Sequence, residues 1–367
     1  RNASIWWTHA RSWQLVESLQ EFGESTVLLD RLTRVERAHS KAKADLAVAR
    51  KQLQELRDSE VSLLARLELF EKPPGKPPTW LTPKHPKKST ATVLAMLSDL
   101  HLDEVVEPAE IDGANAYNRQ IAEQRLQRWT EKMLEMSRDY VAGITIDGAV
   151  VCLGGDLISG DIHEELAETN ETTSLDTIVY WAPLLAGALI TLANHFGKVH
   201  VPCVVGNHGR TTRKPRMKLR VKTNLDWLLC TMIANQLAAD KRITFDIPES
   251  ADCLFEIYDT KILLTHGDQI RGGGAGLGGL FAPLFRFKAK KRVNTQFDLL
   301  MLGHFHTLIL APTAGFVCNG SLKGPDEFSR LMNYPDEEPQ QAFLVCTPEH
   351  GLSIQAPIFV RHPKEKW

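Results

Sequence analysis

Apolar and polar residues change their spacing along this chain, and the first regular pattern is a heptad repeat. From Leu28 to Phe70, apolar residues recur at steps of three and four, with charged residues between them. This spacing predicts a coiled-coil helix, because two such helices can bury a narrow apolar seam against each other. The seam is imperfect, since it includes His39, two alanines and Glu60. A long helix packed on its own globular domain therefore stays as the alternative.

A proline-rich stretch separates this segment from the rest of the chain. Six prolines lie within residues 71–88. Proline fixes the backbone φ angle and lacks the N–H donor, so the stretch predicts an extended, semi-rigid linker. We therefore expect a helical, coiled-coil oligomerisation segment over residues 1–72, a linker over 73–88 and a globular domain over 89–367.

Beyond residue 89, apolar runs of strand length alternate with amphipathic helices. The predicted helices cover residues 116–140, 175–196 and 224–239. The predicted strands cover residues 91–97, 149–155, 200–205, 254–258, 261–265, 298–302, 315–319, 342–346 and 352–358. Strands that alternate with helices and then give way to a strand-rich part predict a layered α/β sandwich with outer helices.

The composition is that of an ordinary globular protein. Hydrophobic residues make up 43% and charged residues 24%, and the net charge of -2 means that any strongly basic surface must be local. No apolar run reaches the roughly 18 residues that a membrane-spanning helix needs, so we expect no membrane contact. The six dispersed cysteines form no C-x-x-C pair, which favours buried thiols and a cytoplasmic location.

Five predicted strands end in side chains that bind transition metals. They are Asp99 and His101, then Asp156, then Asn207 with His208, then His266, and finally His304 with His306. Strand ends of this kind meet at one edge of a parallel sheet. Imidazole with carboxylate suits Mn, Fe or Zn, and a set of this size is too large for one ion and fits two ions about 3.5–4 Å apart that share a carboxylate. The other eight histidines, among them His163, are interpreted as surface or structural residues.

In this order, the motifs D-x-H, G-G-D, G-N-H, T-H-G-D and G-H-x-H resemble the calcineurin-like metallophosphoesterases, including the DNA-repair exonucleases of that superfamily. The resemblance covers residues 92–322 and implies a four-layer αββα sandwich. It implies a first ion held by Asp99, His101 and His306, a second held by Asn207, His266 and His304, and a bridging Asp156. The ions would activate a water for in-line attack on phosphorus.

The resemblance also assigns a role to His208, which would stabilise the transition state or protonate the leaving oxygen. The residue after His208 departs from the family pattern. The family usually has an acid after Asn-His, and here Gly209 stands in its place. The partner that would orient His208 or a neighbouring arginine is therefore unassigned.

Two basic stretches predict a polyanionic substrate. The first, residues 210–222, carries Arg210, Arg213, Lys214, Arg216, Lys218 and Arg220. The second is predicted as a loop over residues 285–292 and carries Lys290, Lys291 and Arg292 beside two phenylalanines. Such loops can follow a phosphate backbone while aromatic rings stack on bases. A solvated charged face is the alternative interpretation.

Together these patterns predict a two-metal phosphodiesterase that uses Mn²⁺, with Fe or Zn possible, and hydrolyses DNA or RNA. One alternative is a phosphatase or phosphodiesterase that acts on small nucleotides or phosphoproteins. Another is a non-catalytic scaffold that presents the coiled coil. The heptad seam predicts a homo-oligomer, which we expect to be a dimer.

Overall fold

The computed structural model describes residues 39–41, 43–52, 78–82, 90–271, 277–362 and 365. The chain divides into two units, Arg1–Glu71 and Lys72–Trp367. In the first unit, residues 39–41 and 43–52 are helical, and Leu46 and Val48 are exposed. The rest of the predicted coiled coil and most of the predicted linker lie outside the described residues.

A six-stranded sheet forms the centre of the second unit. Its order is β11 (Gly351–Phe359), β10 (Gln340–Thr347), β1 (Thr90–Leu97), β2 (Thr145–Leu153), β3 (Val199–Pro202) and β4 (Ile243–Asp246). The strands β1 to β4 are parallel, and β10 and β11 join the other side of β1 in antiparallel pairs. All eight residues of β1 are buried. This explains why its sequence is an unbroken, mostly apolar run rather than an alternating one.

A second sheet has five strands. Its order is β5 (Asp252–Ile257), β6 (Thr260–Thr265), β7 (Leu299–Leu302), β9 (Phe316–Cys318) and β8 (Ile309–Ala311). The strands β6, β7 and β9 are parallel, whereas β5 and β8 pair in antiparallel fashion at the two edges. Two multi-stranded sheets with helices confirm the predicted mixed α/β class.

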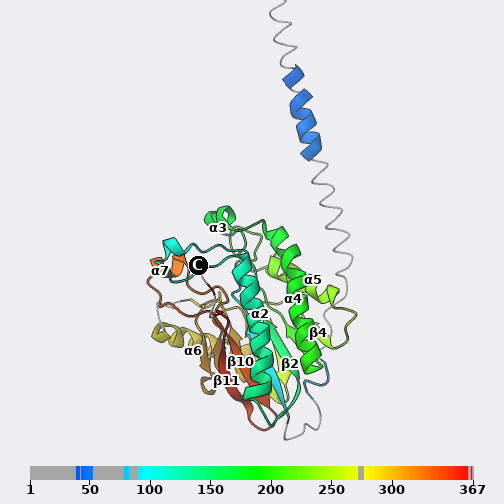
Figure 1. Cartoon of the computed structure of the whole chain (residues 1–367), viewed down its shortest axis with the longest axis vertical. Coiled ribbons are helices and arrows are strands. Elements are labelled where there is room, and N and C mark those ends of the chain that lie inside the picture. The colour runs from blue at the N-terminus through cyan, green and yellow to red at the C-terminus, as the bar shows by residue number, and fades with distance from the viewer. Residues whose placement is uncertain are drawn as a thin grey trace, which may run out of the picture. The chain divides into compact units, whose positions relative to one another are not determined.

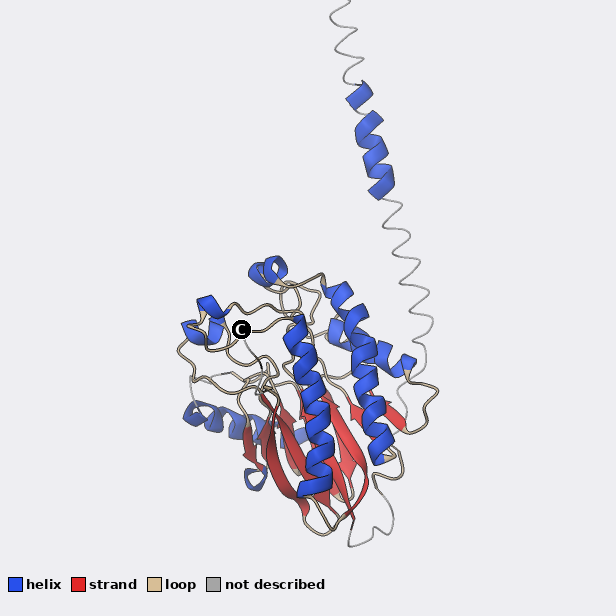
Figure 2. Ribbon diagram, viewed as in Figure 1, coloured by secondary structure: helices blue, strands red, loops and turns tan. Residues whose placement is uncertain are grey.

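The helices α2 to α7 of the second unit are labelled in Figure 1. The long ones are α2 (Arg119–Glu135, extended by the π-helix η2, Met136–Tyr140), α4 (Ser174–Phe196), α5 (Leu225–Gln236) and α6 (Leu277–Asn294). The short ones are η1 (Pro108–Glu110), α3 (Glu164–Thr169), η3 (Pro312–Ala314) and α7 (Glu327–Leu331). Figure 2 shows α2 and α4 in front of the six-stranded sheet, running roughly along its strands.

Three apolar clusters hold the second unit together. The first joins α2, α4 and α5 to the six-stranded sheet and includes Trp129, Trp181 and Val151. The second contains residues of both sheets, such as Met96 and Leu264. The third joins α6 to the five-stranded sheet. Burial of apolar surface is the main favourable term in folding, so these clusters fix where the strand ends lie.

The helix α4 is long and apolar enough to cross a membrane by length and composition. The expectation that no such run exists is therefore wrong. The helix is this apolar because one of its faces packs inside the protein. On that face, the first cluster buries Trp181, Leu185, Leu189 and Leu192. The burial expected for the thiols is confirmed, since all six cysteines are buried and unpaired.

The second basic stretch is not a loop, as predicted, but part of α6. Leu280 and Leu284 are spaced four residues apart and both are buried in the third cluster. This spacing places one face of the helix on the sheet and leaves Lys290 and Arg292 on the exposed side.

Candidate metal centre

The carboxyl ends of strands from both sheets carry the predicted metal ligands. Asp99 and His101 follow β1, Asp156 follows β2, and Asn207 follows β3. From the five-stranded sheet, His266 follows β6, and the segment after β7 supplies His304 and His306. Asp99, His101, Asp156 and His266 are buried. The site therefore depends on both sheets.

Five of these residues have left-handed backbone angles. The φ angles are 54° at Asp99, 47° at His101, 48° at Asp156, 72° at His304 and 53° at His306. Non-glycine residues rarely adopt this region, and strained backbone of this kind gathers at functional sites. Backbone bonds hold the strained turns in place. The N–H of Asp99 donates to Gly155 O at 3.0 Å and the N–H of Leu100 donates to Asp156 O at 2.9 Å.

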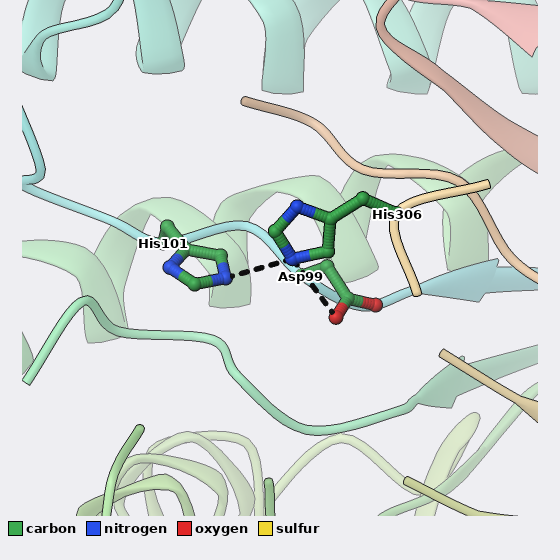
Figure 3. A group of neighbouring side chains, drawn as sticks. All are labelled: Asp99, His101 and His306. Carbon is green, nitrogen blue, oxygen red and sulfur yellow. Dashed lines mark hydrogen bonds and ion pairs between the residues drawn. The ribbon is translucent and has the colours of Figure 1, made fainter. Parts of the chain in front are cut away.

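The first group of converging ligand atoms consists of Asp99, His101 and His306 (Figure 3). The Nε2 atoms of His101 and His306 lie 3.1 Å apart. The Nε2 atom of His306 lies 3.5 Å from Asp99 Oδ1. Two imidazole nitrogens and one carboxylate oxygen thus face a common point, and such a set can hold a divalent transition metal.

Two further groups continue from the first. Asp156, His266 and His304 form one, and the Nε2 atom of His266 lies 2.9 Å from Asp156 Oδ2. His101, Asp156 and His208 form the other, which shares one member with each neighbour. Three overlapping groups that could each hold an ion match the chemistry of a site with two ions and a shared carboxylate.

The predicted seventh ligand, Asn207, also fits a metal. Its carboxamide Oδ1 is buried and has no hydrogen-bond partner among the residues that the structure describes. A buried acceptor without a donor costs free energy unless something else satisfies it. A cation at this position would satisfy that oxygen.

Three of the four proposed histidine ligands have the charge state that metal binding needs. Burial lowers the pKa of His101 and of His304 to about 4, and burial also lowers the pKa of His306. These three rings are therefore neutral at pH 7, and neutral imidazole is the ligand form. The Nδ1–H of His266 donates to Gly154 O at 2.9 Å, which leaves its Nε2 atom facing Asp156.

The carboxylates respond to one another and to His266. Burial raises the pKa of Asp99 to about 7. Burial lowers the pKa of His266, but the attraction of the nearby Asp156 carboxylate is larger and raises that pKa to about 10. The same attraction holds the pKa of Asp156 well below its usual range despite its burial. A bound dication favours the ionised form of every carboxylate here.

His208 lies at the centre of the site with its ring fixed by the backbone. Its Nδ1–H donates to Ser159 O at 2.8 Å, and its backbone N–H donates to Asp156 Oδ1 at 2.7 Å. Its ring packs edge-on against His101, with the centroids 4.4 Å apart. His163 also lies close, with a centroid distance of 6.1 Å to His208. No motif in the sequence marks His163, which was predicted to be a surface or structural residue.

A buried charge network supports His101 from behind. The Nδ1 atom of His101 lies 2.9 Å from Glu104 Oε2, and Lys323 donates to the other Glu104 oxygen at 2.7 Å and to Asp326 at 2.5 Å. Burial opposes ionisation of Glu104, but Lys323 and His101 lower the pKa of that carboxyl. A carboxylate behind a ligating histidine orients the ring and raises its basicity.

Asp99 is supported by neutral side chains. Ser98 Oγ donates to Asp99 Oδ2 at 2.5 Å, and Asn319 Nδ2 donates to Ser98 Oγ at 2.9 Å. Gln341 Oε1 accepts from Asn319 Nδ2 at 2.7 Å and from the N–H of Ser98 at 3.0 Å. The two amide side chains thus fix the hydroxyl that holds Asp99.

The first basic stretch begins beside the metal ligands. Arg210 donates to Asn207 O at 2.9 Å. Arg220 makes two bonds of 2.8 Å to Asp268, so it is paired within the protein. Both arginines line a small cavity of about 20 Å³ together with Asn207 and Arg216. The remaining predicted contacts in this stretch are exposed: Arg213, Lys214, Arg216 and Lys218.

The basic residues of α6 are less available than the sequence indicates. Lys291 forms an ion pair with Asp252 on the neighbouring strand. Lys290 and Arg292 are exposed, and the Arg292 guanidinium lies 5.8 Å from the Phe297 ring. Phe285 is about half exposed, whereas Phe287 is packed against the third cluster.

The chain matches no family model, and no curated protein matches it. Among solved structures, it is similar to a conserved uncharacterised protein and predicted phosphoesterase from Streptococcus pneumoniae, with 14% identity over 73% of this chain and 97% of that chain and a TM-score of 0.28. It is also similar to Thermus thermophilus sulfate thiohydrolase SoxB in complex with glycerol, with 12% identity over 76% and 58% of the two chains and a TM-score of 0.29. TM-scores this low carry no weight for function.

Proposed function

We propose that this protein is a two-metal phosphoesterase with the four-layer αββα arrangement of the calcineurin-like superfamily. Support for the layers comes from the three apolar clusters, which lie between helices and sheet, between sheet and sheet, and between sheet and α6. The observation that carries the function is the set of three overlapping ligand groups at the strand ends, with the buried unpartnered oxygen of Asn207 beside them.

Each residue of the site has a proposed role. Asp99, His101 and His306 would hold one ion, His266, His304 and Asn207 would hold the other, and Asp156 would serve both. When bound, the ions stabilise charge on phosphoryl oxygens and lower the pKa of a water. His208 donates its Nδ1–H to Ser159 O, so its Nε2 atom is the one left to face the leaving oxygen, and the imidazolium form of the ring would give that oxygen a proton from Nε2. We propose Mn²⁺ as the native metal, with Fe or Zn as alternatives.

The proposed substrate is a nucleic acid, DNA or RNA, cleaved at its phosphodiester bonds. The support is the exposed basic run over residues 213–218, which begins five residues after His208 in the chain. Of its charged residues, Arg213 pairs with Glu164 at 3.3 Å, and both side chains are highly exposed. Such a pair is weak and can be exchanged for phosphate contacts. Small nucleotides or phosphoproteins are the second candidate substrates, because Arg210, which donates to Asn207 O, places a cation beside the proposed ligands for a single phosphate.

Charge reversal in the exposed basic run separates these two substrates. The triple variant Arg213→Glu, Lys214→Glu and Arg216→Glu should lose most of its cleavage of a polynucleotide, while hydrolysis of a small chromogenic phosphodiester stays nearly intact. The reason is that the small substrate needs only the metals and His208. The log–log salt slope of polynucleotide binding should flatten by about one unit for each removed cation.

The matched control for this variant is Lys241→Glu, an exposed surface lysine on the short turn before β4. It should change neither substrate. Full polynucleotide cleavage by the triple variant would end the nucleic-acid proposal and promote the small-nucleotide enzyme. Equal loss on both substrates would mean that the run shapes the site rather than binding a chain.

We also propose that the heptad segment makes the protein a dimer. The support is limited to the helical residues 39–41 and 43–52, in which Leu46 is about half exposed within a single chain. Light scattering of the intact chain at micromolar concentration should give the mass of two chains, and Leu46→Glu should shift the equilibrium toward one. A monomeric mass for the intact chain would contradict the dimer.

A further inference from the structure

The two loops that carry Asp156 and Asn207 touch each other through their backbones. A Cβ atom added to Gly155 would lie 2.4 Å from the nitrogen of Gly206. A Cβ atom added to Gly206 would lie 2.0 Å from Asp156 Oδ1. Contacts this short leave room for glycine only. The loops therefore need something other than side-chain packing to fix their relative positions.

The carboxylate of Asp226 joins these two loops. Asp226 lies in the first turn of α5 and is fully buried. Its Oδ2 atom accepts the N–H of Asp156 and the N–H of Gly206, each at 2.9 Å. Its Oδ1 atom accepts the N–H of Leu157 at 3.1 Å. One oxygen thus bridges the loop of the shared metal ligand and the loop of Asn207.

The neighbour Asn224 completes the connection. Its side-chain oxygen caps α5 by accepting the N–H of Asp226 at 2.9 Å, and its Nδ2 atom donates to Gly206 O at 2.8 Å. Asp226 therefore does not cap its own helix, because Asn224 does so. The Asp226 carboxylate instead accepts hydrogen bonds from the two loops that carry Asp156 and Asn207.

The space around Asp226 also explains the glycine that departs from the family pattern. A Cβ atom at Gly209 would lie 2.4 Å from Asn224 Oδ1 and 3.0 Å from the Asp226 carboxyl carbon. An acidic side chain at residue 209 would enter the region that Asp226 occupies. A carboxylate is present in this region, but it comes from a helix that begins 16 residues further along the chain.

We propose that Asp226 is the positioning residue of the metal centre, that it holds the loops of Asp156 and Asn207 at the spacing that two ions require, and that residue 209 is glycine to admit it. This inference rests on the proposed two-metal function. Asp226 is not a ligand in this proposal, because backbone N–H groups already occupy both of its oxygens. No ion pair to Asp226 is found among the residues that the structure describes.

The variant Asp226→Asn tests the proposal. An amide keeps one acceptor oxygen but directs N–H donors at a backbone N–H, so the loops should separate. We expect the affinity for Mn²⁺, measured by calorimetry on the full chain, to fall by about 10-fold to 100-fold, as is usual for residues that support metal ligands. The control is Asp176→Asn, an exposed acid in the first turn of α4, which should leave the affinity unchanged.

A second variant leaves the carboxylate in place. Gly209→Ala adds only a methyl group against Asn224 and Asp226 and should also weaken Mn²⁺ binding. The exchange Gly209→Asp with Asp226→Gly should bind Mn²⁺ more tightly than Asp226→Gly alone, which a purely structural role of Asp226 in α5 does not predict.

The outcomes are distinct. Wild-type Mn²⁺ affinity in a folded Asp226→Asn protein overturns the positioning role and leaves the two-metal function standing. If Asp226→Asn does not fold by circular dichroism, wild-type affinity in Gly209→Ala overturns it instead. A wild-type chain that binds none of Mn²⁺, Zn²⁺ or Fe²⁺ overturns both proposals.

Discussion

Replacing Asp156 with asparagine is expected to abolish phosphoester hydrolysis and to reduce the bound metal while the protein stays folded. Asp156 belongs to two of the three ligand groups, so the variant removes negative charge from both proposed ion positions. It also removes the carboxylate oxygen that lies 2.9 Å from His266 Nε2. Metal content by mass spectrometry, the circular dichroism spectrum and hydrolysis of a chromogenic phosphodiester with Mn²⁺ measure the three effects.

The control for Asp156→Asn is Asp147→Asn on β2, near the opposite end of the strand from Asp156. Asp147 accepts a hydrogen bond from the Tyr258 hydroxyl at 3.0 Å, so its loss should lower stability slightly and leave metal binding unchanged. An active wild-type protein that contains no transition metal would contradict the two-metal proposal.

Removal of the His208 ring should lower the rate by about 10²-fold to 10⁴-fold with the metals retained. The ring is held by Ser159 O, and its Nε2 atom is free to face a leaving group. Metal content and the rate on a small phosphodiester should both be measured for His208→Ala. A substrate whose leaving group needs no proton should be affected least, which separates proton donation from charge stabilisation.

His163→Ala serves as the control, because His163 lies beside His208 without belonging to a ligand group of the described residues. It should keep its metals and change the rate far less than His208→Ala does. Loss of metal from His208→Ala would show instead that His208 is a ligand. This outcome must be tested because His208 forms a candidate ligand group with His101 and Asp156.

The sequence predicted nine of the strands, the helices α2, α4 and α5, and the residues that follow the strand ends, but it missed β4, β8, α3, α6 and α7. The buried run before Asp99 and the runs before Asp156 and Asn207 are strongly apolar because parallel central strands are covered on both faces. Polar residues that interrupt such runs are conspicuous. The structure brings His101, Asp156 and His304 into overlapping ligand groups although they are separated by up to 203 positions in the chain.

The supporting residues could not be predicted in this way. Glu104 and Lys323 meet only in three dimensions, and neither has a motif around it. Asp226 acts through backbone N–H groups of residues 156, 157 and 206, and such bonds leave no pattern in a sequence. The only signal was negative, namely a glycine at residue 209 where the resemblance implies an acid.

Two other expectations from the sequence were wrong, one about residues 285–292 and one about the length of the apolar runs. The basic content of residues 285–292 suggested a loop, yet Leu280 and Leu284 before it mark the buried face of α6. In α4, exposed apolar residues such as Val179 and Ile190 add to the buried face, so the whole helix reaches the hydropathy of a membrane span.

The division of the ligands between two sheets has a thermodynamic consequence. Asp99 and Asp156 belong to strand ends of the six-stranded sheet, whereas His266 and His304 belong to those of the five-stranded sheet. An ion that draws ligands from both binds only a chain in which both sheets have formed and packed. Its binding free energy therefore stabilises only the state in which both sheets are folded, so the two sheets should unfold together when the ion is bound.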